Sequence, residues 1–255
     1  MKFARYYAHG EVAYGLYEAD KDRVVQLTTT PFREYEVTGH IHDLDEVEVL
    51  SPCNPSKGMA MALNYRSHLG DQAAPKRPEP FYKTPNAIIG PGDPIILPRD
   101  AGRVDEEAEL VVVIGKRCKG VSVDQALEYV LGYTCGIDVS ARAWQGGEDK
   151  DISWWRAKSS DTFGPIGPFI STDLDPFNFE VICRVNGTEV QRCRSEDLIY
   201  DIPTIISFIS QVVTLNPGDV IFTGTAGATT TLNPGDTVEV EIPGIGVLSN
   251  PVEAE

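Results

Sequence analysis

The chain lacks a long apolar run and has little positive charge for its length. None of its apolar stretches approaches the roughly 20 residues that a membrane-spanning helix needs, so no transmembrane segment is expected. Its 22 Lys and Arg residues stand against 38 Asp and Glu, which gives a formal net charge of −16 over 255 residues. This balance argues against nucleic acid or an anionic membrane as a partner. It does not exclude small anionic substrates, which respond to the local field.

Paired cysteines are also missing. The chain has five cysteines, an odd number, and none forms a Cys-x-x-Cys motif. The first five residues do not resemble a secretory signal. We therefore expect reduced thiols and a cytoplasmic location.

Turn-forming residues are plentiful, with 23 Gly and 18 Pro, and they favour a β-rich fold. Three Pro-Gly-Asp turns, at residues 91–93, 217–219 and 234–236, each precede a strand-like run. Proline presets φ at the first corner of such a turn, and glycine accepts a positive φ at the second. Short strand candidates near the N-terminus predict a small β unit at residues 1–47, followed by one main domain at residues 48–255.

Helical patterns are few. A capping-box pattern at Ser122 predicts a helix over residues 122–130. Asp201 is placed to cap a second helix, whose apolar stripe runs to Val213, and a short helix is expected over residues 65–73. The sequence therefore predicts a β-rich α+β fold with a few covering helices.

The most informative segment runs from Val104 to Gly115. Its β-branched half, residues 110–114, is typical of a buried strand. Because alternate strand residues share a face, Asp105, Glu107 and Glu109 are expected to point the same way. Like charges this close repel one another unless a cation lies between them. A divalent cation bound between them would offset this repulsion. The alternative is that the segment is simply a solvated acidic strand end.

Other polar groups suggest catalysis. His68 and Asp71 would share one face of a helix, where a carboxylate that orients an imidazole gives a general base. Asp138 can add a third carboxylate to a metal, and Arg142 offers a forked donor for a substrate carboxylate, with Gln145 on the same side. Taken alone, these pairs are more typical of ordinary surface and helical contacts than of a catalytic site.

Two more segments concentrate polar groups. Lys158, beside two tryptophans and a Gly-Pro turn, can place a partly buried cation against the acidic cluster, although a solvated loop lysine fits the same pattern. The Thr-Gly-Thr-x-Gly run that contains Thr225 presents hydroxyl and backbone N–H groups to an anion. Small-residue turns of this kind are common in proteins of many functions.

Together, these segments resemble the fumarylacetoacetate hydrolase family over about residues 48 to 253. The resemblance is carried by Asn64-Tyr65 with His68, Phe81-Tyr82-Lys83, Gly90-Pro91-Gly92-Asp93, Glu107-x-Glu109-Leu110, Asp138-Val139-Ser140-x-Arg142, Lys158, Asp161 to Pro165, and Gly218-Asp219 through Thr225. It implies a mixed β-sandwich roll that is preceded by a small N-terminal β unit.

The resemblance also implies a Mg²⁺ or Mn²⁺ site on Glu107, Glu109 and Asp138. The residue types agree with it, because a set of carboxylates without His or Cys favours a hard cation over zinc. The implied catalytic residues are His68, on a lid that orders when substrate binds, with Asp71 and Lys158. The implied substrate-binding residues are Tyr65, Lys83, Arg142, Gln145 and Thr225.

Two positions depart from the family pattern. Asp71 stands where many members carry a glutamate, which shortens the reach of the His68 pair by one methylene. Ala226 replaces the usual proline after Thr-Gly-Thr, which leaves that loop less constrained. Neither change removes the metal site, but both bear on the substrate.

The implied activity is a metal-dependent hydrolase that cleaves a C–C bond in a 1,3-diketo or acylpyruvate-type acid through an enolate. Alternatives within the family are a decarboxylase of oxaloacetate-like acids and an isomerase or decarboxylase of hydroxymuconate-type diacids. An alternative of another class is a non-catalytic acidic β module that binds Ca²⁺. A homodimer acting on a small anionic keto acid is expected.

Overall fold

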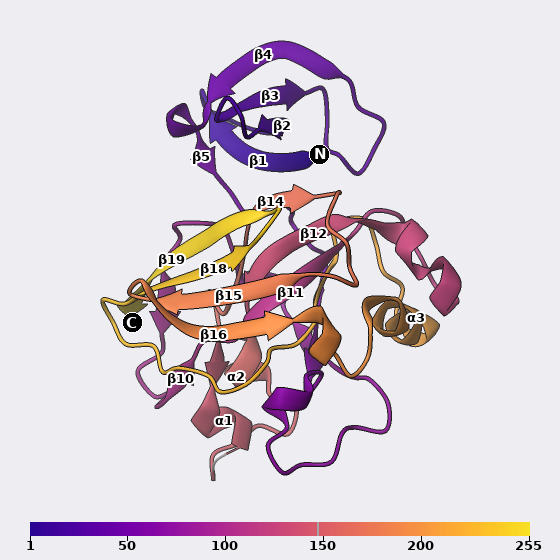
Figure 1. Cartoon of the computed structure of the whole chain (residues 1–255). Helices are drawn as coiled ribbons and strands as arrows, with labels where there is room; N and C mark the ends of the chain where they lie inside the picture. The colour runs from indigo at the N-terminus through magenta and orange to yellow at the C-terminus, as the bar shows by residue number, and fades with distance from the viewer. Residues whose placement is uncertain (147) are drawn as a thin grey trace.

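The computed structural model describes residues 1–146 and 148–255, and three β-sheets dominate it (Figure 1). The large sheet contains β1 (Lys2–Ala8), β2 (Glu11–Glu18), β3 (Arg23–Leu27), β4 (Val37–Asp43), β5 (Glu48–Val49), β6 (Gly58–Ala62), β7 (Glu79–Lys83), β8 (Ile88–Ile89), β11 (Ala108–Ile114), β12 (Val130–Ile137), β14 (Gly164–Ser171) and β17 (Val220–Phe222). The second sheet contains β9 (Ile95–Leu97), β15 (Glu180–Val185), β16 (Thr188–Arg194), β18 (Thr237–Ile242) and β19 (Gly246–Ala254). A small ribbon pairs β10 (Val104–Asp105) with β13 (Ser140–Ala141).

Helices are short and few, as expected. The α-helices are α1 (Arg142–Gly146), α2 (Trp155–Ser159) and α3 (Ile202–Val212). The 3₁₀-helices are η1 (Leu44–Glu46), η2 (Arg66–His68), η3 (Pro85–Ala87), η4 (Val123–Tyr129) and η5 (Ser195–Asp197). No helix of the described residues is long and apolar enough to cross a membrane.

The two main sheets pack face to face and enclose the core. The large sheet has the order β4-β3-β2-β1-β14-β12-β11-β17-β6-β7, and the second has β16-β15-β18-β19-β9. Figure 1 shows β15, β16, β18 and β19 lying in front of β11 and β12. The β-rich prediction is therefore confirmed.

Strand β11 is buried on both faces, which explains its unbroken apolar sequence. Leu110, Val112 and Ile114 belong to the core cluster between the sheets. Val111 and Val113 point to the opposite side, into a second cluster that includes Phe222. The same alternation extends to the acidic residues at the start of the strand, so Glu107 and Glu109 lie on one face of it.

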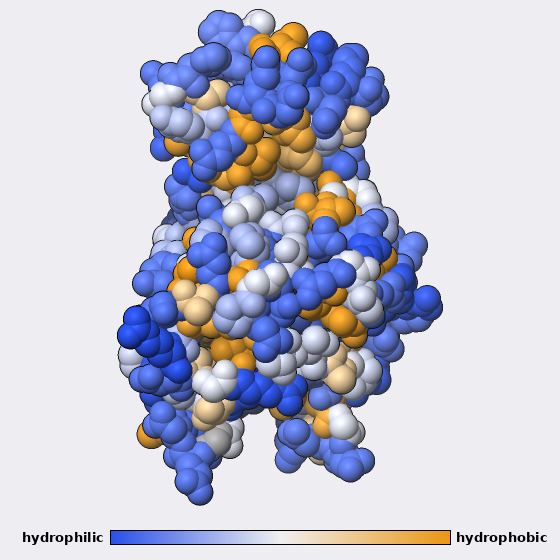
Figure 2. Space-filling model, turned by 90° about the vertical axis from the view of Figure 1, so that its left-hand side faces the viewer, coloured by the Kyte–Doolittle hydropathy of each residue, from blue (hydrophilic) through white to orange (hydrophobic). Residues whose placement is uncertain are grey.

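The N-terminal unit forms an upper lobe that Figure 2 shows joined to the larger body by a narrower waist. Its strands continue the large sheet, because β1 pairs with β14 through Phe3 and Ile170. Strand β4 was not anticipated, since most of its residues are exposed and it gives little apolar signal. The division into residues 1–47 and 48–255 stays a prediction.

The three Pro-Gly-Asp turns share one chemistry. Their glycines have φ values of +79° (Gly92), +85° (Gly218) and +94° (Gly235), as expected. In each turn the aspartate side chain accepts a hydrogen bond from the backbone N–H three residues earlier, at 2.7–2.8 Å. The side chain therefore closes the turn that proline and glycine begin.

Two of the three expected helices differ from the prediction. Helix α3 begins at the predicted cap, where Asp201 accepts a hydrogen bond from the backbone of Thr204. The segment after Ser122 is instead a 3₁₀-helix, because the Ser122 hydroxyl bonds the Gln125 side chain and caps no backbone N–H. The segment at residues 65–73 contains only the single turn η2.

Gly136 in β12 lies opposite Glu109 in β11, where the packing leaves no room for a side chain. A Cβ atom there would lie 2.3 Å from a methyl of Val111 and 2.8 Å from the ring of Phe222. We predict that Gly136→Ala lowers the free energy of unfolding by about 1–3 kcal/mol, the usual cost of overpacking. Urea titration tests this. Gly39→Ala is the control, since its Cβ meets nothing within 4 Å, and equal losses in both variants would contradict the prediction.

Candidate metal and substrate site

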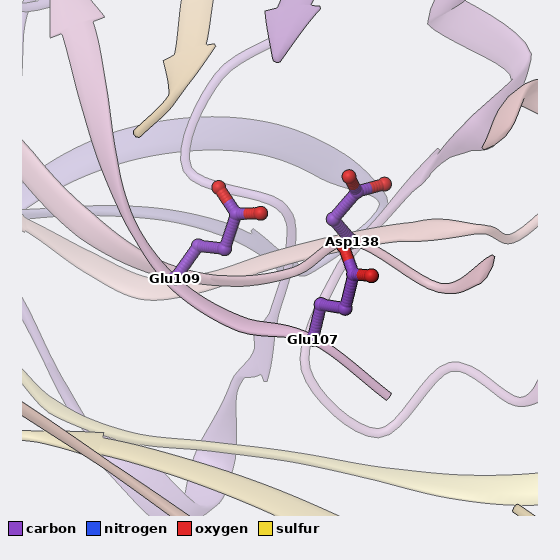
Figure 3. Close-up of side chains that lie close together, drawn as sticks. All are labelled: Glu107, Glu109 and Asp138. Atoms are coloured by element: carbon purple, nitrogen blue, oxygen red, sulfur yellow. The ribbon is translucent and has the colours of Figure 1, made fainter. Parts of the chain in front are cut away.

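Three buried carboxylates meet where β11 begins and β12 ends. Glu107 immediately precedes β11, Glu109 lies within it, and Asp138 follows β12. The backbone N–H of Asp138 donates to the Glu107 carbonyl at 2.8 Å, which brings the strand ends together. One oxygen of each carboxylate lies within 4.8 Å of the others, and Figure 3 shows all three on neighbouring strands.

Two buried lysines neutralise part of this charge. The Lys158 ammonium donates to Glu107 and Asp138 at 2.7 Å each, and Lys83 donates to the other oxygen of Asp138 at 2.6 Å. Burial lowers the pKa of Lys83. Burial also acts to lower the pKa of Lys158, but the charges of Asp138 and Glu107 outweigh it and raise that pKa.

Glu109 has no ammonium or guanidinium partner among the described residues. Its carboxylate accepts a hydrogen bond from the backbone N–H of Gly224 at 2.6 Å. Burial, followed by the charges of Asp138 and Glu107, raises the pKa of Glu109 well above its usual range. The three carboxylates therefore lie against two ammonium groups and the guanidinium group of Arg142, which contacts Glu107.

This donor set fits a hard divalent cation. It offers carboxylate oxygens without imidazole or thiolate, the ligands that Mg²⁺ and Mn²⁺ prefer. A dication bound here would add two positive charges beside Lys158, which suits an anionic keto acid. Glu107, Glu109 and Asp138 would hold it, with Lys158 beside them.

Asp105 belongs to the same acidic segment but not to the cluster of Glu107, Glu109 and Asp138, which we call the carboxylate trio. Its carboxylate accepts hydrogen bonds from Arg103 at 2.7 Å and Arg142 at 2.8 Å. Burial raises the pKa of Asp105, but the two guanidinium groups outweigh it and hold the pKa at about 2. Asp105 therefore has cations of its own.

Arg142 links Asp105 to the trio. Besides Asp105, its guanidinium contacts Glu107 and Gln145 at 2.7 Å each. Burial acts to raise the pKa of Glu107, but the charges of Lys158 and then Arg142 hold it at about 2. We expected Arg142 to face a substrate carboxylate, and the structure shows its donors occupied by these protein groups.

A small cavity of about 40 Å³ opens beside the trio. Five residues expected at the site line it: His68, Glu107, Gln145, Lys158 and Thr225. The other lining residues are largely apolar: Met61, Ala62, Leu63, Phe81 and Trp154. The cavity therefore combines one polar end with apolar walls.

His68 lies on a short segment that is fastened to the loop after Thr225. Its Nδ1 is 2.7 Å from the carbonyl oxygen of Gly227, and the Ser67 hydroxyl accepts from the N–H of the same glycine at 3.1 Å. Since a carbonyl only accepts, Nδ1 carries the proton and Nε2 has a free lone pair. The imidazole is thus oriented as a base.

The expected pairing of His68 with Asp71 is not present in the described structure. Asp71 is exposed, and no hydrogen bond joins it to the imidazole. The reason is local: η2 ends at His68, and Gly70 has a φ of +56°, so the chain leaves the helical path that would align the two side chains.

Tyr65 and Lys83, both expected to contact substrate, do not line the cavity. Tyr65 is fully buried, and its hydroxyl has no hydrogen-bond partner in the described structure. Lys83 is also fully buried and donates to Asp138 and to the carbonyl of Lys158 at 2.5 Å. This places Lys83 as a support for Asp138 and for the segment that carries Lys158.

Several residues in or next to the cavity carry no clear signal in the sequence. Met61 and Leu63 come from the end of β6 and the turn after it, where Leu63 has a φ of 53°. Ser140 accepts a hydrogen bond from Lys158 at 2.5 Å, a role that its place in the Asp138-Val139-Ser140 motif does not predict. Trp154 lines the cavity, and the sequence signal for it is its position in an aromatic pair close to Lys158.

Replacement of Lys83 by methionine should strongly destabilise the protein. Removing one member of a buried ion pair leaves the other charge uncompensated, which costs about 3–5 kcal/mol. Urea titration in EDTA measures this loss. Lys21→Met, which breaks an exposed pair with Glu18, should cost less than about 1 kcal/mol. Similar losses for the two variants would show that Lys83 does not compensate Asp138.

Comparison with known proteins supports one family. The model for "Fumarylacetoacetate (FAA) hydrolase C-terminal" matches residues 57–253, and the model for "Rv2993c-like, N-terminal" matches residues 1–52. An oxaloacetate tautomerase from mitochondria of Xenopus laevis is 39% identical over 226 residues, which cover 84% of this chain and 70% of that protein.

Two solved structures are similar over the whole chain. A 5-carboxymethyl-2-hydroxymuconate delta-isomerase from Mycobacterium smegmatis has a TM-score of 0.93 and 42% identity, covering 100% of both chains. A maleylpyruvate hydrolase from Sphingobium sp. SYK-6, in complex with manganese (II) ion and pyruvate, has a TM-score of 0.81 and 28% identity. It covers 100% of this chain and 99% of that chain.

Proposed function

The chain belongs to the fumarylacetoacetate hydrolase family, and from this we propose that it is a divalent-metal-dependent hydrolase of short acylpyruvate-type acids. The observation that carries the proposal is the buried carboxylate trio, one member of which, Glu107, lines the same cavity as Lys158 and His68. A metal site, a fixed cation and an oriented base within one cavity are the groups that C–C bond hydrolysis requires.

A divalent cation, once bound, would supply Lewis acidity that favours the enolate form of a keto acid. Its ligands would be Glu107, Glu109 and Asp138, with Mg²⁺ and Mn²⁺ as the candidates. Manganese is supported by the maleylpyruvate hydrolase structure, which contains manganese (II) and pyruvate. Lys158 adds positive charge next to two of these carboxylates, where negative charge develops on the substrate oxygen.

His68 is the proposed general base. Its Nε2 takes a proton from water, and the hydroxide attacks the distal carbonyl of the substrate. The C–C bond then breaks, the electron pair stays on the pyruvate portion as an enolate, and that carbon is protonated to give pyruvate and a carboxylic acid. Orientation of the ring by the Gly227 carbonyl performs the task expected of Asp71.

The remaining cavity residues bind and enclose the substrate. Gln145 and Thr225 contribute polar groups at the end nearest Glu107, and Phe81 and Trp154 form an apolar wall for the acyl tail. A cavity of about 40 Å³ is far below the roughly 300 Å³ at which ligand pockets begin. Substrate entry therefore requires some of the lining residues to move, and we infer that the segment that carries His68 moves away from Gly227.

A second candidate function keeps the enolate but breaks no C–C bond by hydrolysis. An oxaloacetate tautomerase and a hydroxymuconate isomerase are among the relatives, at 39% and 42% identity. The same Lys158 and His68 would move a proton between carbon and oxygen of a diacid, or support loss of CO₂ from an oxaloacetate-like acid. A non-catalytic Ca²⁺ module is the weaker explanation, because it assigns no role to His68.

The experiment that tests the proposal offers a short acylpyruvate and oxaloacetate side by side, with Mg²⁺ or with EDTA. Pyruvate and a carboxylic acid formed from the acylpyruvate establish the hydrolase. Enol–keto conversion or release of CO₂ from oxaloacetate alone replaces it by the second candidate. Absence of turnover on both, with metal binding intact, contradicts both functions for these substrates.

The homodimer and the cytoplasmic location stay predictions. Exposed apolar side chains do occur beside the site, on Tyr82, Ile152 and Trp155. A second copy of the chain would cover them. Sedimentation of the purified protein gives the mass directly, and a monomer at micromolar concentration would contradict the dimer.

A further inference from the structure

Three of the four histidines of the chain line a second pocket, in the N-terminal unit. Its volume is about 320 Å³, and it shares no lining residue with the cavity beside the carboxylate trio. The polar residues that line it are Tyr6, His9, Glu11, Gln26, His40 and His42. An imidazole cluster of this kind differs chemically from the all-carboxylate site.

The pocket exists because the sheet of the N-terminal unit curls on itself. Strands β1 and β4 are separated by β2 and β3 in the sheet order, and Figure 1 shows β4 arching over the others. The rings of Tyr6 in β1 and His42 in β4 are nevertheless 5.6 Å apart between centroids. The pocket is therefore the concave side of the curl.

His9 and His42 are already paired. His9 occupies the first corner of the turn between β1 and β2 with a φ of 51°, a position that Asn or Gly usually fills. Its ring centroid lies 5.3 Å from that of His42. Two imidazoles that bind one tetrahedral metal, with metal–nitrogen distances of 2.0–2.1 Å, have centroids about 5 Å apart. The observed spacing matches this value.

Other polar groups at the pocket lack partners. No ring nitrogen of His9, His40 or His42 has a hydrogen bond among the residues that the structure describes. His40 and His42 both come from β4 and both line the pocket. The lone pairs of three imidazoles are thus free to coordinate an ion.

Tyr6 provides independent support for a ligand. Its side chain is fully buried, yet its hydroxyl has no hydrogen-bond partner in the described structure. Burial raises the pKa of Tyr6, so the hydroxyl keeps its proton and can donate. A buried donor without an acceptor costs about 1–3 kcal/mol. A water or anion held by a metal in this pocket would accept from it.

We propose that this pocket is a transition-metal site, bound by His9 and His42. His40 and Glu11 line the same pocket. They do not form a group of three converging ligands with this pair in the described structure, so either would complete the site by turning toward the ion. Imidazole ligands suit Zn²⁺, Ni²⁺ and Cu²⁺ rather than Mg²⁺. The ion would connect the β1–β2 turn to the edge strand β4 and would stabilise the curled sheet. This site is independent of the catalytic proposal.

The test uses Zn²⁺ as the probe and the full-length protein. The background is Glu109→Gln, which removes a carboxylate ligand from the other site. We expect about one equivalent of Zn²⁺ to shift the NMR signals of the His9 and His42 rings, to leave the His68 ring unchanged, and to raise the melting temperature. His42→Asn in the same background should weaken Zn²⁺ binding at least about tenfold, while His68→Asn should leave it unchanged.

A second variant distinguishes lost metal binding from misfolding of the curled sheet. Tyr6→Phe removes only the hydroxyl, so we expect the melting temperature in EDTA to stay the same or rise, and Zn²⁺ binding to weaken about tenfold. Unchanged Zn²⁺ affinity in both His42→Asn and Tyr6→Phe, or a shift of the His68 signal alone, would overturn the proposal.

Discussion

Glu109→Gln is expected to abolish Mg²⁺-dependent turnover while the protein stays folded. Glu109 is the member of the trio without a cationic partner among the described residues. Its replacement by glutamine therefore leaves no lysine or arginine without its ion-pair partner. The amide oxygen of glutamine can still accept from the N–H of Gly224. Loss of a metal ligand should weaken Mg²⁺ or Mn²⁺ binding by more than the roughly 10–100-fold that supporting residues cost.

The loss of rate follows from the loss of metal. A Lewis acid contributes several kcal/mol to stabilisation of the transition state, and each 1.36 kcal/mol is a factor of ten. We therefore expect kcat to fall by about 10³-fold or more at ordinary Mg²⁺ concentrations, measured with the substrate that the wild-type protein turns over.

The stability of the metal-free variant provides the control. Burial and the charges of Asp138 and Glu107 disfavour the ionised form of Glu109, so replacing this carboxyl by an amide should leave the free energy of unfolding in EDTA unchanged or raise it. Glu107→Gln should behave differently, because Glu107 contacts both Lys158 and Arg142. That variant should lose both metal binding and stability. Wild-type turnover in Glu109→Gln would remove this residue from the metal site.

His68→Ala is expected to lower kcat by about 10²–10⁴-fold, the usual contribution of a general base. Metal binding should survive, because none of the carboxylates of the trio depends on the imidazole for a hydrogen bond. The combination of lost turnover and retained Mn²⁺ affinity separates a catalytic role for His68 from a role in building the site.

Asp71→Asn is the matched variant for this prediction. Because Asp71 is exposed and does not contact His68, we expect turnover within about threefold of the wild type, since surface substitutions rarely exceed about 0.5 kcal/mol. A loss as large as that of His68→Ala would show that Asp71 reaches the imidazole once substrate is bound. Near-normal turnover in His68→Ala would contradict the proposed base.

Features with local causes could be predicted from the sequence. The run from Leu110 to Ile114 is apolar because both faces of β11 are buried. The alternation of Glu107 and Glu109 follows from strand geometry and placed both carboxylates on one side. The Asp201 cap and the Pro-Gly-Asp turns need only neighbouring residues, so their outcome did not depend on the rest of the fold.

Features that depend on distant partners could not be predicted in this way. His68 is oriented by Gly227, which is 159 residues away in the chain. Arg142 meets Asp105 because β10 pairs with β13, and neither of these short strands gives a periodic signal. The 3₁₀ geometry after Ser122 shows a related limit, because a capping pattern marks the start of a turn without fixing its hydrogen-bond spacing.

The most direct test is a crystal structure with Mn²⁺ and oxalate, a planar dianion that resembles the enolate of pyruvate. The account predicts one anomalous Mn²⁺ peak with an oxygen of Glu107, Glu109 and Asp138 each about 2.0–2.2 Å away, and oxalate beside Lys158. A strong peak elsewhere, with the three carboxylates still held by Lys83, Lys158, Arg142 and the Gly224 N–H, would contradict the proposed metal centre.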